Sequence, residues 1–253
     1  MAFIIYLDKM KNPQLFLLHF AGGSCYSFQF LISELQGFEV FALELPGRGK
    51  RTQEALLTDF DAAAQDIFDQ LLAKLTSPHF VLYGHSMGAY LALQVSRMLE
   101  NDKFFPAHVF VSGNAGPGAS VATQRFLLGR SDFVDELRKM GGVPEELFEN
   151  DELLDYFLPI VRADFQIAEQ NTVAQSCVVQ APIYAMMGSG EEQVASIANW
   201  GRFTTGGFQH SVLTGGHFFI HDHPVAIAAI LDDQYRQSVL KRAAGPVSAV
   251  ADT

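Results

Sequence analysis

The chain has few of the features that mark secreted, membrane-bound or nucleic-acid-binding proteins. Its only cysteines, Cys25 and Cys177, lie far apart and lack the spacing of metal ligands. This usage favours reduced thiols in a cytoplasm, and neither cysteine follows a pattern typical of a nucleophile. Lysine and arginine number 17 against 28 aspartates and glutamates, for a formal net charge of −11. No basic run offsets that charge, which argues against nucleic acid or an anionic membrane as a partner.

Long hydrophobic runs are also missing. The opening Met1 to Leu7 is apolar but short, has no basic region before it and is followed by Asp8, so it does not have the pattern of a signal peptide. No apolar stretch reaches the length that spans a bilayer. With 253 residues and 49% hydrophobic content, the chain suits one sizeable domain covering 1–253. We expect a soluble, cytoplasmic protein with a disordered tail over 243–253.

Strand-like and helix-like segments alternate along the chain. A sheet whose strands are separated by helices pairs in parallel and is covered on both faces, which predicts an α/β fold with function at the carboxyl ends of the strands. The expected strands are Leu15 to His19, Val40 to Leu45, Phe80 to Tyr83, His108 to Ser112, Ile183 to Met187 and Gln209 to Leu213. The expected helices between them are Phe28 to Leu35, Phe60 to Leu75, Ala89 to Glu100, Val194 to Trp200 and Pro224 to Leu240.

One segment breaks this alternation. About seventy residues separate Ser112 from Ile183, far more than an ordinary connection between a strand and a helix. Helical patterns occur within it, with turns expected at Gly141-Gly142 and at Pro159, so we predict a helical lid over about 119–170. Its many apolar residues either line an apolar channel over the active site or pack the lid onto the body of the protein.

The segment around Ser86 carries the clearest chemical signal. An apolar strand is followed by Gly84-His85-Ser86-Met87-Gly88 and then by a helix. This is the G-x-S-x-G pattern of a nucleophile elbow, in which glycines allow the sharp turn that exposes the serine hydroxyl. Ser86 is therefore the candidate nucleophile.

A serine hydroxyl needs a base, and the base needs an acid that fixes its tautomer. His217 follows an expected strand through Thr214-Gly215-Gly216, which places it at a carboxyl end. It is our candidate base among the eight histidines. The acid should follow the strand that ends at Met187, where the chain offers Glu191 and Glu192 but no aspartate. We choose Glu191 and keep Glu192 as the alternative.

The oxyanion of an acyl-transfer intermediate needs two backbone N–H donors. One should belong to Met87, directly after the nucleophile. The second should come from the loop after the first strand, His19-Phe20-Ala21-Gly22-Gly23, where Ala21 is our candidate and Phe20 the alternative.

Five motifs together resemble the type II thioesterases, which are discrete α/β-hydrolases that accompany nonribosomal peptide and polyketide synthases. The resemblance covers nearly the whole chain. The family usually has aspartate where this chain has Glu191, and commonly has proline where it has His19. The five motifs are Leu18 to Ser24, Glu44 to Gly49, Gly84 to Ala89, the pair Gly141 to Pro144 with Leu158 to Phe165, and Gly215 to Phe219.

The resemblance implies hydrolysis of acyl or aminoacyl thioesters on the phosphopantetheine arm of carrier domains, which clears stalled or misprimed groups. The enzyme itself would need no cofactor and no metal, since its substrate carries the phosphopantetheine, and we expect a monomer whose partners are acyl or peptidyl carrier domains. Two alternatives remain open: a stand-alone esterase or acyl-CoA thioesterase, and a catalytically weak carrier-binding protein. Four arginines are candidates to meet the phosphate or an acidic carrier helix, with a solvated surface role as the alternative: Arg48, Arg125, Arg130 and Arg162.

Overall fold

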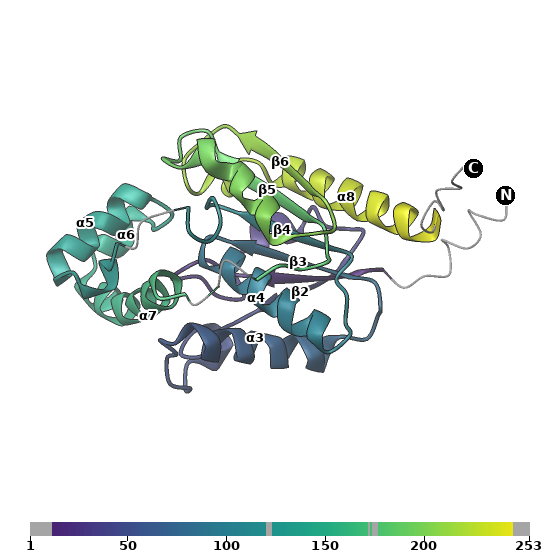
Figure 1. Cartoon of the computed structure of the whole chain (residues 1–253). Helices are drawn as coiled ribbons and strands as arrows, with labels where there is room; N and C mark the ends of the chain where they lie inside the picture. The colour runs from purple at the N-terminus through teal and green to yellow at the C-terminus, as the bar shows by residue number, and fades with distance from the viewer. Residues whose placement is uncertain (1–11, 120–122, 172, 174–176, 245–253) are drawn as a thin grey trace, which may run out of the picture.

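Six parallel strands form the centre of the protein. The computed structural model describes residues 12–119, 123–171, 173 and 177–244 (Figure 1). The strands lie in the order β2-β1-β3-β4-β5-β6, and each neighbouring pair is parallel, as the α/β prediction requires. Their bounds are β1 Gln14–Leu18, β2 Glu39–Leu43, β3 Phe80–His85, β4 His108–Ser112, β5 Ile183–Gly188 and β6 Phe208–Leu213.

Helices cover both faces of this sheet. The α-helices are α2 Gln29–Ile32, α3 Phe60–Lys74, α4 Met87–Asn101, α5 Arg130–Met140, α6 Glu145–Phe148, α7 Asp151–Glu169 and α8 Pro224–Ala244. The 3-10 helices are η1 Gly49–Arg51, η2 Arg125–Leu127, η3 Val194–Phe203 and η4 Phe219–His221. The segment expected as a helix from Val194 is thus 3-10, and α8 includes residues 243 and 244, where a tail was expected. The rest of that tail lies outside the described residues.

The core has two layers because side chains alternate along each strand. In β1, Phe16 and Leu18 pack with α3, α4 and η3, whereas Leu15 and Leu17 pack with α2 and α8 on the opposite face. All five residues of β1 are buried. This central position leaves only the ends of the strand free to carry polar groups, and the loop after Leu18 lies at its carboxyl end.

The helices α5 to α7 stand together at one end of the molecule (Figure 1). Their apolar residues form a separate small core that includes Phe133, Leu154, Leu158 and Phe165. Most of the apolar side chains in this segment therefore bury one another. We call the helices α5, α6 and α7 the insertion.

The turn expected at Pro159 is wrong, because α7 continues through it from Asp151 to Glu169. A proline inside a helix removes one hydrogen bond and costs about 3 kcal/mol. Residues on both sides of Pro159, among them Leu154, Leu158 and Val161, are buried in one cluster. Burial of each such side chain contributes roughly 1.5–3 kcal/mol, so packing outweighs the local preference for a break.

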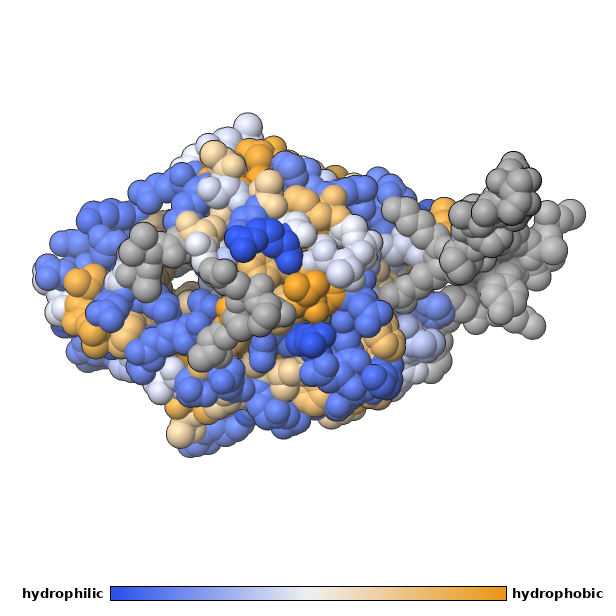
Figure 2. Space-filling view, viewed as in Figure 1, coloured by the Kyte–Doolittle hydropathy of each residue, from blue (hydrophilic) through white to orange (hydrophobic). Residues whose placement is uncertain are grey.

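Among the described residues, no helix is both long and apolar enough to cross a membrane. On the face shown in Figure 2, hydrophobic residues are scattered among hydrophilic ones.

Candidate active site

Ser86 lies at the apex of a strained turn between β3 and α4. Its backbone has φ 56° and ψ −115°, a region that side chains rarely adopt and that costs about 1–3 kcal/mol. The Ser86 N–H donates to the carbonyl of Ser112 at 2.7 Å, and its carbonyl accepts from Asn114 Nδ2 at 2.8 Å. These bonds to the end of β4 hold the turn. Asn114 was not recognised in the sequence, because only the fold brings it beside the elbow.

The two glycines of the motif are required by close backbone approaches. A Cβ on Gly84 would lie 2.0 Å from the carbonyl oxygen of Gly88. A Cβ on Gly88 would lie 2.2 Å from the carbonyl oxygen of Leu18. Any side chain at either position would therefore separate the elbow from α4 or from the end of β1.

Ser86, His217 and Glu191 form one hydrogen-bonded chain. His217 Nε2 lies 3.0 Å from Ser86 Oγ, and His217 Nδ1 lies 3.0 Å from Glu191 Oε2. An ionised carboxylate only accepts hydrogen bonds, so it holds the proton on Nδ1 and leaves Nε2 free to accept from the serine. The other carboxylate oxygen, Glu191 Oε1, accepts from the Gly188 N–H at 2.8 Å. Glu192 is exposed.

Backbone contacts bring the acid loop and the histidine loop together. The Ser189 N–H donates to Leu213 at 2.7 Å and the Gly190 N–H donates to Gly215 at 2.8 Å. These bonds continue the pairing of β5 with β6 beyond the ends of the strands. The geometry between His217 and Glu191 is thus set by the sheet itself.

A second histidine lies under the first. His85 is fully buried, its ring centroid lies 5.1 Å from that of His217, and its Nδ1 is 2.8 Å from Ser112 Oγ. Burial holds the pKa of His85 well below its ordinary value, with the nearby His217 adding to the effect. His85 is therefore neutral and supports the site through packing.

The oxyanion candidates come from adjacent segments. Met87 is the first residue of α4, so its N–H lies at a helix N-terminus, which attracts negative charge. The close approach of Gly88 to Leu18 places this helix start against the loop that contains Ala21. Both candidate donors thus belong to backbone at the carboxyl ends of β1 and β3.

His19 links the loop after β1 to the loop after β2. Its Nε2 accepts from the Leu45 N–H at 3.3 Å, which leaves the proton on Nδ1, and Nδ1 donates to the Phe20 carbonyl at 2.8 Å. Burial, with a further contribution from Arg48, lowers the pKa of His19 and keeps this tautomer neutral. His19 is thus a structural link between the loops after β1 and β2.

The expectation that Arg48 lies at the surface is wrong, whereas Arg125, Arg130 and Arg162 are at least partly exposed and have partners within the protein. Arg48 is buried and pairs with the fully buried Asp164 of α7. Arg125 pairs with Glu136 and Glu169, and Arg130 with Asp151 and Asp155. Arg162 donates to the carbonyls of Phe126 and Leu128. A single sequence does not reveal these pairs, because each partner is distant along the chain.

Neither cysteine has the properties of a nucleophile. Burial raises the pKa of both thiols, that of Cys177 to about 11, so both are protonated near neutral pH. Within the described ranges, no cluster of three histidine, cysteine or acidic side chains could hold a metal ion.

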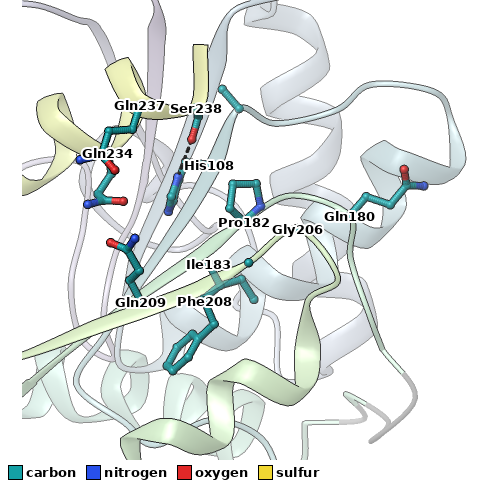
Figure 3. Close-up of a pocket in the computed structure, with 12 residues that line it drawn as sticks. His108, Gln180, Pro182, Ile183, Gly206, Phe208, Gln209, Gln234, Gln237 and Ser238 are labelled. Carbon is teal, nitrogen blue, oxygen red and sulfur yellow. Dashed lines mark hydrogen bonds between the residues drawn. The ribbon is translucent and has the colours of Figure 1, made fainter. Parts of the chain in front are cut away.

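A cavity of about 320 Å³ lies at the opposite end of the sheet from Ser86 (Figure 3). It is lined by residues at the start of β4, β5 and β6 and by α8, and it contains the hydrogen bond between His108 Nδ1 and Ser238 Oγ at 3.0 Å. Because parallel strands carry functional loops at their carboxyl ends, this cavity is separate from the site at Ser86.

A family model for the thioesterase domain matches residues 13–235. The chain belongs to the thioesterase family. This thioesterase is 33% identical over 226 residues to the protein named Linear gramicidin dehydrogenase LgrE of Brevibacillus parabrevis, covering 86% of each chain. The family and the α/β-hydrolase fold inferred from the motifs are both confirmed.

Solved structures agree with this assignment. The thioesterase superposes on the type II thioesterase BorB from the borrelidin biosynthetic cluster with a TM-score of 0.79 at 30% identity, covering 89% of this chain and 92% of that one. It superposes on ClbQ from the colibactin NRPS/PKS pathway with a TM-score of 0.84 at 25% identity, covering 91% and 99%. It is a serine hydrolase similar to type II thioesterases of biosynthetic clusters.

Proposed function

We propose that the protein hydrolyses acyl or aminoacyl groups from the phosphopantetheine arm of carrier domains, with Ser86 as nucleophile, His217 as general base and acid, and Glu191 as the acid that orients His217. The observation that carries this proposal is the hydrogen-bonded chain from Ser86 Oγ through His217 to Glu191 at the carboxyl end of the sheet. The carrier as partner is supported by similarity to thioesterases of biosynthetic clusters.

Each step uses one member of this chain. His217 Nε2 takes the proton of Ser86 as Oγ attacks the thioester carbonyl, and the N–H groups of Met87 and Ala21 bind the oxyanion that forms. His217 then gives the proton to the departing thiolate of phosphopantetheine, which leaves an acyl ester on Ser86. Water, deprotonated by His217, attacks this ester and releases the free acid and the serine.

The insertion is the proposed lid of this site. Its turn at Gly141-Gly142 meets Phe218, the residue after His217: a Cβ on Gly142 would lie 2.2 Å from the Phe218 ring. The Phe218 ring in turn packs edge-on against Phe20 with centroids 5.0 Å apart. These contacts place the insertion directly beside the residue that follows His217.

The experiment compares one acyl group on a carrier domain, on coenzyme A and on an oxygen ester. We expect kcat/KM to be highest for the carrier, by at least about tenfold over coenzyme A, since only the carrier adds protein contacts. Ser86→Ala should remove at least about a thousandfold of the rate on every substrate. Ser33→Ala, which removes an exposed hydroxyl just after the end of α2, is the matched control with unchanged rates.

Equal rates on the carrier and on coenzyme A would favour the stand-alone acyl-CoA thioesterase. A normal rate for Ser86→Ala would remove this serine from the mechanism. Tight carrier binding by a wild-type protein with no turnover would favour the carrier-binding alternative.

A further inference from the structure

Asp164 is a fully buried carboxylate that belongs to the insertion but contacts the loop after β1. It lies in the second half of α7. Its Oδ2 accepts from the Gly22 N–H at 2.7 Å. The Arg48 guanidinium binds the same carboxylate with both terminal nitrogens, Nη2 reaching Oδ1 at 2.8 Å and Nη1 contacting Oδ2.

Arg48 extends this contact to the rest of the loop. The arginine is 3% exposed, and its Nη1 also lies 3.4 Å from the Gly23 carbonyl. Three segments far apart in sequence thus meet at one ion pair: the loop after β1, the loop after β2 and α7. The loop after β1 packs tightly against α7 at Gly22, because a Cβ on Gly22 would lie 3.0 Å from Phe157 and 3.0 Å from Val161 of α7.

The bond to Gly22 determines how one peptide group is turned. Peptide units are planar, so the direction of the Gly22 N–H also sets the direction of the Ala21 carbonyl. Gly22 has φ +77°, a conformation in which glycine leaves the adjacent peptide easy to rotate. Without an acceptor on α7, the Ala21-Gly22 peptide could turn. The Ala21 N–H belongs to the preceding peptide, whose Phe20 carbonyl accepts from the Gly23 N–H at 2.9 Å, so a turn at Gly22 would displace Gly23 and loosen the peptide that carries the Ala21 N–H.

We propose that Asp164 is a positioning residue for the oxyanion hole, which holds the Ala21 N–H toward Ser86 by anchoring the Gly22 N–H to α7. This inference rests on the proposed function, in which Ala21 donates to the oxyanion. The helix α7 is then part of the catalytic framework as well as of the lid. Rate enhancement from an oxyanion hole depends on donors that are already in place, so a loose loop should lower kcat more than it raises KM.

The test uses two double variants that differ only in the acceptor for Gly22. In Arg48→Met with Asp164→Leu, both buried charges are removed together, a replacement that folded proteins often tolerate, but Gly22 loses its acceptor. In Arg48→Met with Asp164→Asn, the amide oxygen can still accept from Gly22. We expect the leucine variant to lose about 10- to 100-fold in kcat with KM within about threefold, and the asparagine variant to recover most of that loss.

A matched control removes another ion pair that follows β2. Arg51 Nη1 pairs with Asp66 Oδ2 of α3 at 2.7 Å. Arg51→Met with Asp66→Leu should leave kcat within about twofold. This ion pair joins α3 to the segment after β2 and does not contact the loop after β1. Circular dichroism and thermal unfolding establish that each variant is folded before kinetics are compared.

Equal kcat values for the leucine and asparagine variants would overturn the proposal, since Asp164 would then contribute only to packing. If the double variants do not fold, amide exchange of the wild-type protein decides. The Gly22 amide should then be as protected as the amides of β3, and exchange at the rate of an open loop would overturn the anchor. An inactive wild-type protein, or an active Ser86→Ala variant, would instead count against the proposed function.

Discussion

The replacement Glu191→Gln tests the third member of the proposed triad. The wild-type carboxylate accepts two hydrogen bonds, one from His217 Nδ1 at 3.0 Å and one from the Gly188 N–H at 2.8 Å. A glutamine has one acceptor oxygen and one donor group, so it satisfies only one of these two partners. The Glu191 side chain is 8% exposed, so little water is available to bond to the partner that the glutamine leaves without a hydrogen bond.

Either orientation of the glutamine harms the reaction. If the glutamine oxygen faces Gly188, its NH₂ group faces His217 Nδ1 and donates to it. The imidazole proton then lies on Nε2, and Nε2 cannot accept the proton of Ser86. If its oxygen faces His217, an N–H group opposes the Gly188 N–H and no negative charge stabilises the imidazolium. A wrong tautomer lowers kcat by about 10³- to 10⁴-fold, which equals about 4–5.4 kcal/mol of transition-state stabilisation.

The assay follows thiol release from an acyl thioester of N-acetylcysteamine, a small mimic of the phosphopantetheine arm. Glu192→Gln is the control, because it makes the same chemical change on the exposed neighbour and should alter kcat less than twofold. Glu191→Asp should lose about 10- to 100-fold, since the shorter side chain cannot keep both hydrogen bonds from the same backbone position. A Glu191→Gln variant with more than a tenth of the wild-type kcat would refute the reasoning. A severe loss in Glu192→Gln alone would move the assignment by one residue.

Two further predictions concern the surroundings of the site. Gly142→Ala should lower kcat about tenfold, because its Cβ would press on the Phe218 ring beside His217. Gly141→Ala has a similarly positive φ of +74° but meets no atom within 4 Å, so equal kcat losses in both variants would contradict this contact. The second prediction is that acid destabilises the fold through buried neutral His85, whose pKa is lowered by burial. Below about pH 6.5 the unfolded state gains a proton that the folded state does not, so stability is full above that pH and falls as pH decreases. Between pH 6.5 and 5.5 the wild type should lose about 1 kcal/mol more than His85→Asn in urea unfolding, and parallel losses would contradict the assignment.

Local patterns were sufficient for the alternating architecture and for Ser86. The strands of β1 and β3 are buried on both faces, so they have continuous apolar sequences, and the elbow depends on glycines at fixed positions beside the serine. Both signals lie within a few residues of one another. His217 could also be predicted from the sequence, since it follows an expected strand through a glycine turn.

Contacts between residues that are distant along the chain could not be predicted from local sequence patterns. Arg48 resembles a surface arginine in sequence, and only the packing of α7 against the loop after β2 brings it to Asp164. Asn114 supports Ser86 because β4 lies beside β3, which no local pattern states. Pro159 predicts a helix end, yet burial on both sides of it keeps α7 continuous.

The choice between Glu191 and Glu192 shows where this boundary lies. The sequence narrowed the candidate acid to the two adjacent glutamates after β5, because the end of a strand and the loop that follows it are local features. Only the tertiary structure shows which of the two contacts His217, since the pairing of β5 with β6 sets which side chain turns toward His217 and which toward solvent. Local sequence specifies where chain segments begin and end, whereas the energy that orients a side chain comes from neighbours that only folding supplies.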